Sequence, residues 1–423
     1  MKKSTKVRLI IFKILIEVYK KNRNFDDLFD LEVKKNKLNN NEKTFIFNIS
    51  LNTMRYNIHS KSILDIFVKK KLKSTQLVLL SSAVTQIVFL NIKPYAVVNE
   101  TVEIAKKIGL YSSFINAVLN KIVKNVENLK KIKITRENLP LWFQKEVKKD
   151  KNINLDVFLK SYFLQPSTHL VFKSTKYLDI FLEDYEKSSS NSMFIKSKKK
   201  VVDLYNYKKG HWWVQNFSSM LPILLGPNLN DKNIIDLCAA PGGKAFQILS
   251  KTDKIILNDI SKKRIRTLKD NLSRLSFNVK IENFNALEFP SEKKFDVVLL
   301  DSPCSSIGTI RSNPEILFKS KGPNLTSLIN LQKKLLEKSS TLLKPKGIIL
   351  YMVCSFFFSE TIKPIEEFLK KNKNFSILKY KKASKELEIN TLISKDGYFL
   401  TTPQIYKGYK IDGFFSIQLI KND

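Results

Sequence analysis

Cysteine, histidine and glycine are scarce in this chain. Its 423 residues include only three cysteines, three histidines and 11 glycines. A disulfide framework needs cysteines in pairs, and a zinc site needs cysteines and histidines clustered at short spacings. His59, His169 and His211 form no such cluster with the cysteines. The sequence therefore predicts neither structural disulfides nor a metal site.

Long apolar runs are missing as well. The segment MKKSTKVRLIIFKILIEVYKK begins like a signal peptide, but Lys13 and Glu17 interrupt its apolar stretch and no small-residue cleavage site follows. No uninterrupted apolar segment reaches the ~18 residues that a membrane helix needs. We therefore expect an amphipathic first helix, no membrane partner, a cytoplasmic location and a monomeric chain.

Acidic residues are outnumbered. Lys and Arg total 74 against 39 Asp and Glu, which gives a net charge of +35. Such a field holds a polyanion through counterion release, so nucleic acid is the leading partner. Only eight of the basic residues are arginines. Because an A+T-rich genome also favours lysine, compositional drift is an alternative source of part of this charge.

Three regions of the sequence differ in their pattern of apolar residues and turn residues. Residues 1–135 repeat apolar positions at helical spacing and contain almost no turn residues, which predicts an all-α domain. Its first helix shows the pattern at Val7, Ile10, Ile11, Ile14, Leu15 and Val18. Residues 136–212 predict a small α+β module that links domains or binds RNA, and the run Lys196–Lys200 is either a solvated loop or an RNA contact. Residues 213–423 alternate apolar strands with helices, which predicts a Rossmann-like α/β domain.

The first strand of that domain, IIDLC, leads into a turn of small residues, AAPGGK. Ligands bind beyond the carboxyl ends of such strands, but this turn has neither a dinucleotide fingerprint nor the spacing of a P-loop. The next strand ends at Asp259, 23 residues after Asp236, where an acid can accept both hydroxyls of a ribose. An adenosyl ligand without a phosphate chain, S-adenosylmethionine, fits best. The alternative for Asp259 is a helix N-cap.

Two later strands deliver thiols, one in DSPCSSIG after Asp301 and one in YMVCSF. These strands are neighbours in a doubly wound sheet, so Cys304 and Cys354 should face one cleft. Two facing thiols without metal ligands suggest covalent catalysis, although a lone cysteine at a strand end is more often a small core residue.

A pyrimidine gives the covalent step a purpose. A thiolate added at C6 of cytosine makes C5 reactive toward a methyl sulfonium, and the thiol is eliminated after a base has removed the C5 proton. Asp301 is placed to hydrogen-bond N3 and the N4 amino group of the base. The base must leave any stack to reach the cleft. By this chemistry alone, either thiol can be the nucleophile.

The segments DLCAAPGGK, NDISKKRI, DSPCSSIGTIRSNPEI and MVCS resemble the successive motifs of the RNA cytosine-5 methyltransferases. The segment KKGHWWVQN resembles the sequence that precedes them in the bacterial branch. NIKPYAVVNETVEIAKKIGL and INAVLNKIV are similar to the helical NusB-like RNA-binding domain. That pairing is typical of the RsmB/Sun family, and the resemblance covers essentially the whole chain.

The resemblance implies a function and a set of site residues. The implied function is S-adenosylmethionine-dependent methylation of C5 of a cytosine in 16S rRNA, namely cytosine 967. Cys354 is implied as the nucleophile, Cys304 as the thiol that assists product release, and Asp301 as a contact of both cofactor and cytosine. The implied cofactor contacts are Cys238, Ala239, Ala240, Pro241, Gly242, Gly243, Lys244, Asp259, Asn285 and Asp301.

The chain departs from the family pattern at several positions. Ser306 stands where a glycine is usual, Val353 where a threonine precedes the nucleophile, and an acidic pair is reduced to Ser359 and Glu360. Asn285 replaces the aspartate expected after the third strand. These changes bear on rate and loop geometry. The same chemistry on transfer RNA and a non-catalytic RNA-binding or ribosome assembly factor are the alternatives.

Overall fold

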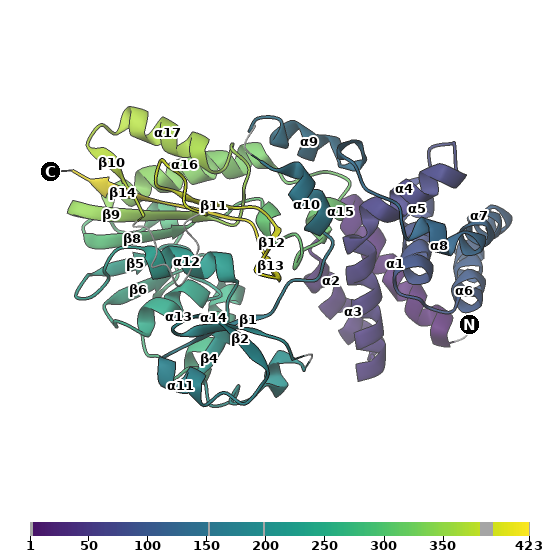
Figure 1. The fold of residues 1–423 in the computed structure, drawn as a ribbon, viewed down its shortest axis with the longest axis horizontal. Coiled ribbons are helices and arrows are strands. Elements are labelled where there is room, and N and C mark those ends of the chain that lie inside the picture. Colours follow the sequence, from purple (N-terminus) through teal and green to yellow (C-terminus); the bar gives the residue numbers. More distant parts are fainter. Residues whose placement is uncertain (1–2, 151–152, 198, 381–391, 423) are drawn as a thin grey trace. The chain divides into compact units, whose positions relative to one another are not determined.

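The computed structural model describes residues 3–150, 153–197, 199–380 and 392–422 (Figure 1). Lys198, within the lysine run named above, lies outside these residues. The chain divides into two compact units, Met1–Lys148 with Ile310–Pro323, and Lys149–Thr309 with Asn324–Asp423. Within the described ranges, no helix combines the length and hydropathy that a membrane span requires.

The first unit is all-α, which confirms the class predicted from helical spacing. Its main helices are α1 (Lys3–Lys21), α2 (Phe25–Asn36), α3 (Asn40–Arg55), α4 (Asn57–Phe67), α5 (Ser74–Val84), α6 (Pro94–Lys107) and α7 (Ser112–Lys124). All six apolar side chains that predicted the first helix are buried in α1. A capping box between Asn39 and Glu42 starts α3, and Pro94 stands in the first turn of α6.

A segment remote in sequence also belongs to this unit. Ile310–Pro323 follows the Pro-Cys motif and contains the short helix α15 (Glu315–Phe318). Buried Arg55 donates a hydrogen bond to the carbonyl oxygen of Arg311 at 3.0 Å. The ring of Phe318 packs edge-on against Tyr19, with 5.4 Å between the ring centres. Nothing in the sequence pattern predicted this attachment.

The second unit contains a small antiparallel sheet with strand order β2-β3-β1-β4. The strands are β1 (His169–Phe172), β2 (Tyr185–Ser189), β3 (Ser192–Ile195) and β4 (Trp212–Val214). Short helices accompany them, α10 (Leu155–Ser161) before the sheet and α11 (Thr175–Asp179) after β1. Trp212 is fully buried on one side of this sheet among apolar side chains. The middle region is therefore an α+β module.

A large mixed sheet forms the rest of the second unit, with the order β10-β14-β9-β8-β5-β6-β7. Five strands are parallel: β5 (Ile234–Asp236), β6 (Ile255–Asn258), β7 (Lys280–Glu282), β8 (Phe295–Asp301) and β9 (Leu343–Val353). Antiparallel strands β14 (Phe414–Lys421), β10 (Phe375–Leu378) and β11 (Phe399–Thr401) extend the β9 edge. The Rossmann-like class is confirmed, with an antiparallel edge that the sequence did not predict.

Helices cover both faces of this sheet, as Figure 1 shows. One layer holds α12 (Phe217–Leu225), α13 (Gly243–Leu249) and α14 (Lys262–Arg274), and the other holds α16 (Leu325–Thr341) and α17 (Ile362–Lys371). Alternate residues of β8 enter opposite layers, Val297 and Leu299 on one side, Val298 and Leu300 on the other. This burial on both faces explains the continuous apolar runs of the strands.

Candidate active site

The carboxyl end of β5 carries the small-residue turn that begins the site. Gly242 has a φ of +115°, and a Cβ there would lie 2.2 Å from the ring of Phe246, so only glycine fits the turn. Asp236, the last residue of β5, is buried, and its carboxylate accepts a hydrogen bond from the Cys238 amide. Burial, and then the charge of Asp301, raises the pKa of Asp236 to about 7. The position of Asp236 in the sequence predicted no role for it.

Asp259 lies directly after β6 with its carboxylate completely buried. It accepts hydrogen bonds from the amides of Ala240 and Ser261 at 3.2 and 2.8 Å. The guanidinium of Arg264 contacts both of its oxygens, at 3.0 and 2.8 Å. Ser261, not Asp259, is the N-cap of α14. The N-cap alternative for Asp259 is therefore wrong, and its role at a ribose stays a prediction.

Asn285 lies just beyond β7 and is engaged locally. Its side-chain oxygen accepts a hydrogen bond from the Leu287 amide at 3.2 Å, and its amide nitrogen donates to Glu288 at the same distance. It thereby caps a short 3₁₀ turn, Ala286–Glu288. Its implied contact with the cofactor stays a prediction.

Lys244 and Asp301 form an ion pair across the carboxyl ends of β5 and β8. The ammonium nitrogen lies 2.6 Å from Asp301 Oδ2 and 4.9 Å from the ring centre of Phe414. Burial opposes the charge of Lys244, but the charge and hydrogen bond of Asp301 outweigh it, so the pKa of Lys244 is raised. Lys244 therefore keeps its positive charge and is held against the Asp301 carboxylate.

The two thiols predicted to face one cleft lie side by side. Strands β8 and β9 are hydrogen-bonded neighbours, and Cys304 Sγ is 3.3 Å from Cys354 Sγ. A hydrogen bond from Cys304 lowers the pKa of Cys354, and Ser306 and the charge of Lys244 act in the same direction, against burial and the charge of Asp301. The same hydrogen bond, together with burial, raises the pKa of Cys304. Cys354 is thus the thiol that ionises more easily.

Ser306, one of the departures from the family pattern, adopts a left-handed backbone conformation with φ of +56°. Glycine adopts this conformation without strain, which explains why glycine is usual there. The serine hydroxyl lies 3.5 Å from Cys354 Sγ, within reach of the sulfur. The substitution therefore adds a hydrogen-bonding group beside the thiol at the expense of backbone strain.

Replacing Ser306 by glycine should separate these two effects. We expect the free energy of unfolding to rise by up to about 1 kcal/mol as strain is relieved, and the pKa of Cys354 to rise as the hydroxyl is lost. Denaturant unfolding measures the change in stability, and the pH dependence of Cys354 alkylation measures the change in its pKa. Ser276→Gly is the matched control, because Ser276 also has a positive φ, +53°. An unchanged alkylation profile in Ser306→Gly would show that the hydroxyl does not assist the thiol.

Glu360 holds the two thiol-bearing loops together, a role that its place in the sequence did not predict. Its side chain is fully buried. The carboxylate accepts hydrogen bonds from the Ser305 amide at 2.7 Å, the Ser305 hydroxyl at 2.5 Å and the Ser355 hydroxyl at 2.6 Å. Gln332 donates a fourth at 3.2 Å. The two serines directly follow the two active-site cysteines, so this one carboxylate fixes where both thiols stand.

Glu360→Gln should destabilise the site, since an amide nitrogen replaces one of the two acceptor oxygens. We expect the free energy of unfolding to fall by about 1–3 kcal/mol and the difference in reactivity between the two thiols to shrink. Glu366→Gln makes the same chemical change at an exposed position, where the loss should stay below about 0.5 kcal/mol. Equal unfolding free energies and equal thiol reactivity in the two variants would contradict this role.

The third cysteine differs from the other two. Cys238 is free and partly buried against the layer of α16 and α17. Burial and the neighbouring carboxylates, Asp236 first, raise its pKa, so it stays a protonated thiol. This environment suits a side chain that packs beside the turn, and the cofactor contact implied for Cys238 stays a prediction. Among the described residues, no group of three His, Cys, Asp or Glu side chains is arranged to hold a metal ion.

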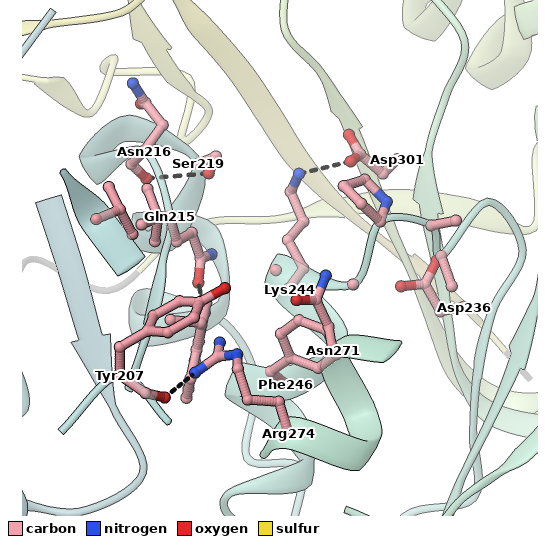
Figure 2. A pocket seen from close by; sticks show the side chains of 18 residues that line it. Tyr207, Gln215, Asn216, Ser219, Asp236, Lys244, Phe246, Asn271, Arg274 and Asp301 are labelled. Atoms are coloured by element: carbon pink, nitrogen blue, oxygen red, sulfur yellow. Dashed lines mark hydrogen bonds and ion pairs between the residues drawn. The ribbon is translucent and has the colours of Figure 1, made fainter. Parts of the chain in front are cut away.

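A cavity of about 340 Å³ adjoins the turn after β5. Figure 2 shows Lys244 and Asp301 at one part of its wall, and Tyr207 and Arg274 at another. Gln215 also lines the cavity and donates a hydrogen bond to Gln247. Neither Cys304 nor Cys354 lines the cavity, whereas both members of the Lys244–Asp301 ion pair do. The positions of Tyr207, Gln215 and Arg274 in the sequence did not predict that they line this cavity.

Comparison with known proteins agrees with the two-part organisation. Residues 222–420 match the family model of the 16S rRNA methyltransferase RsmB/F, and residues 5–124 match that of the NusB family. The ribosomal RNA small subunit methyltransferase B of Shewanella oneidensis is 28% identical over 359 residues, which cover 79% of this chain and 80% of that protein. The protein of the same name from Photorhabdus laumondii is 30% identical over 226 residues, 52% of this chain and 49% of its own length.

Among solved structures, that of PH0851 is similar across the whole chain. It has a TM-score of 0.71 and 21% sequence identity, and the match covers 100% of this chain and 99% of that one. At this identity, the likeness concerns the fold alone. Through residues 222–420 the chain belongs to the RsmB/F methyltransferase family, and it carries a NusB-family domain at residues 5–124.

Proposed function

We propose that the chain transfers a methyl group from S-adenosylmethionine to C5 of a cytosine in 16S ribosomal RNA through a covalent adduct with Cys354. The observation that carries this proposal is the pair of thiols 3.3 Å apart beside the Lys244–Asp301 ion pair. The family supports an RNA methyltransferase. The chemistry of these side chains supports cytosine as the target base, C5 as the methylated carbon and a covalent adduct as the intermediate.

The side chains around the turn fit the cofactor. Asp259 offers a buried carboxylate for two ribose hydroxyls, and Gly242 permits the tight turn that packs against Phe246 and presents its backbone at the end of β5. Asp301 lies where the turn meets the thiols and is partly exposed, so it can contact both ligands. When bound, S-adenosylmethionine supplies the electrophilic methyl group. Asn285 and the backbone from Cys238 to Gly243 complete the proposed contacts.

The protein's own groups account for activation of the base. The thiolate of Cys354 adds to C6 while N3 takes up a proton from solvent, and the Asp301 carboxylate accepts hydrogen bonds from this N3–H group and from the N4 amino group. Lys244 keeps positive charge beside the carboxylate and the thiolate. After methyl transfer, removal of the C5 proton allows the Cys354 sulfur to leave. Cys304, whose pKa is raised, is a protonated thiol in contact with that sulfur and assists its departure.

Methyl transfer to purified RNA tests the proposal. Labelled S-adenosylmethionine should pass its methyl group to 16S rRNA and not to transfer RNA, and bisulfite sequencing should then show one protected cytosine. Methyl transfer to tRNA alone would show that the same reaction acts on transfer RNA and would contradict the proposed substrate. Binding of RNA without binding of S-adenosylmethionine, measured by calorimetry, would leave the assembly-factor alternative. The target nucleotide, cytosine 967 by resemblance, is read from the same map.

A further inference from the structure

Cationic side chains gather beside the small sheet of the second unit. Lys173 Nζ lies 4.9 Å from the ring centre of Phe277, and Lys176 Nζ lies 5.1 Å from that of Tyr177. The ring of Tyr177 stacks on His211, with 4.0 Å between centres. The Lys173 amide donates to the His211 carbonyl oxygen at 3.1 Å. Aromatic faces thus hold two lysines around one histidine.

Arg274, the last residue of α14, is held close to this group of lysines and His211. Its guanidinium donates to the carbonyl oxygens of Tyr207 and Trp212, at 3.0 Å each, and lies 4.4 Å from the Tyr207 ring centre. Figure 2 shows the bond to Tyr207 at the wall of the cavity. With exposed Lys209 next to Gly210, these residues form a cation cluster: Lys173, Lys176, Lys209 and Arg274.

No carboxylate among the described residues forms an ion pair with any member of the cation cluster. Elsewhere in this unit, Lys199 pairs with Glu183 and Lys254 with Asp231. Within the cluster the charges act on one another. Burial, and then the charge of Arg274, lowers the pKa of Lys173. Burial and three lysines of the cluster lower the pKa of His211, so its ring adds no charge at neutral pH. An anion would relieve this repulsion.

The cation cluster reaches the cavity beside the turn after β5 through one member, Arg274, and its three lysines lie outside the cavity lining. Arg274 and Tyr207 line the same cavity as Lys244 and Asp301. A nucleotide whose base reaches Asp301 through this cavity carries charged phosphates on either side of its ribose. Lysine and arginine side chains without acidic partners are the groups that recognise such phosphates.

We propose that the cation cluster binds a backbone phosphate of the RNA strand next to the nucleotide that enters the cavity. This inference rests on the proposed function, since it takes the polyanion to be the RNA substrate. The cluster contacts the sugar-phosphate chain and no base edge, so it positions the strand and carries no sequence preference.

The test compares two double variants of the full chain. Lys173→Gln with Lys176→Gln removes two charges from the cluster. Lys370→Gln with Lys371→Gln removes two exposed charges from the end of α17, away from the cavity. Affinity for a fluorescent single-stranded RNA that contains cytidine is measured over a series of salt concentrations. For the cluster variant we expect roughly tenfold weaker binding and a slope of log K against log salt that is shallower by about 0.7–1.4.

Calorimetry with S-adenosylmethionine separates the possible anions. Unchanged cofactor affinity in the cluster variant supports an RNA phosphate, whereas a loss would assign the cluster to the cofactor's carboxylate and overturn the proposal. Equal RNA affinity in both double variants would overturn it too. The binding measurement needs no methyl transfer. A wild-type chain that binds RNA with the predicted salt slope but transfers no methyl group would therefore contradict the proposed function and leave the phosphate site standing.

Discussion

Cys354→Ala is expected to abolish methyl transfer to RNA, with a fall in rate of roughly 10⁴-fold or more. Cys354 is the thiol whose pKa is lowered, by Cys304 first and by Ser306 and Lys244 in addition. Without the sulfur, C5 of cytosine is too weak a nucleophile to take the methyl group. Transfer of labelled methyl groups from S-adenosylmethionine to 16S rRNA measures the effect.

The control for this variant is Cys238→Ala, which removes the one cysteine that is not part of the thiol pair. Cys238 packs against the layer of α16 and α17 and keeps its proton, so its replacement should cost only a modest part of the rate. Both variants should bind S-adenosylmethionine, which shows that they are folded. A fully active Cys354→Ala enzyme would rule out Cys354 as the nucleophile.

Cys304→Ala should instead trap a covalent complex of protein and RNA. Cys304 Sγ lies 3.3 Å from the proposed nucleophile and holds its proton, so its loss slows departure of the Cys354 sulfur from C6. The adduct should resist denaturant and appear on a denaturing gel as a slow band that contains both protein and labelled RNA. Turnover should fall by about 10²–10⁴-fold, the range for a lost acid–base group.

The double variant Cys304→Ala with Cys354→Ala controls this experiment, because it cannot form the adduct. Ribonuclease treatment should return the trapped band to near the position of the free protein. The roles of the two thiols would be reversed if the adduct formed in Cys354→Ala and not in Cys304→Ala. In that case Cys304 would be the nucleophile.

The sequence predicted the parts of the site that depend on strand order. Motifs at the ends of successive apolar strands placed Asp301, Cys304 and Cys354 together, because parallel strands present their carboxyl ends at one edge of the sheet. The adjacency of β8 and β9 confirms that placement. The role of Asp259 could not be chosen from sequence, since a cap and a ligand contact both occur before a helix. Tertiary structure excluded the cap, because the Ser261 side chain fills that position.

The role of Glu360 and the convergence of the cation cluster could not be predicted from the sequence, for a different reason. Glu360 reads as a remnant of an acidic pair, but besides nearby Ser355 it binds donors on Gln332 and Ser305, which lie 28 and 55 residues away in the sequence. Arg274 ends an ordinary amphipathic helix, and Lys173 follows a short strand. Their convergence depends on how the small sheet packs against α14, which no local pattern encodes.

Taken alone, the sequence determined the all-α and Rossmann-like classes, and it predicted the small-residue turn after the first strand and the two thiols that later strands bring to one edge of the sheet. Periodicity and small-residue turns encode these features locally, through burial and backbone freedom. Only the tertiary structure decided that the thiols lie 3.3 Å apart, that Glu360 ties their loops together and that Ile310–Pro323 packs with the helical unit. Distances between segments far apart in the chain follow from strand register and side-chain packing, and these form only when the whole fold does.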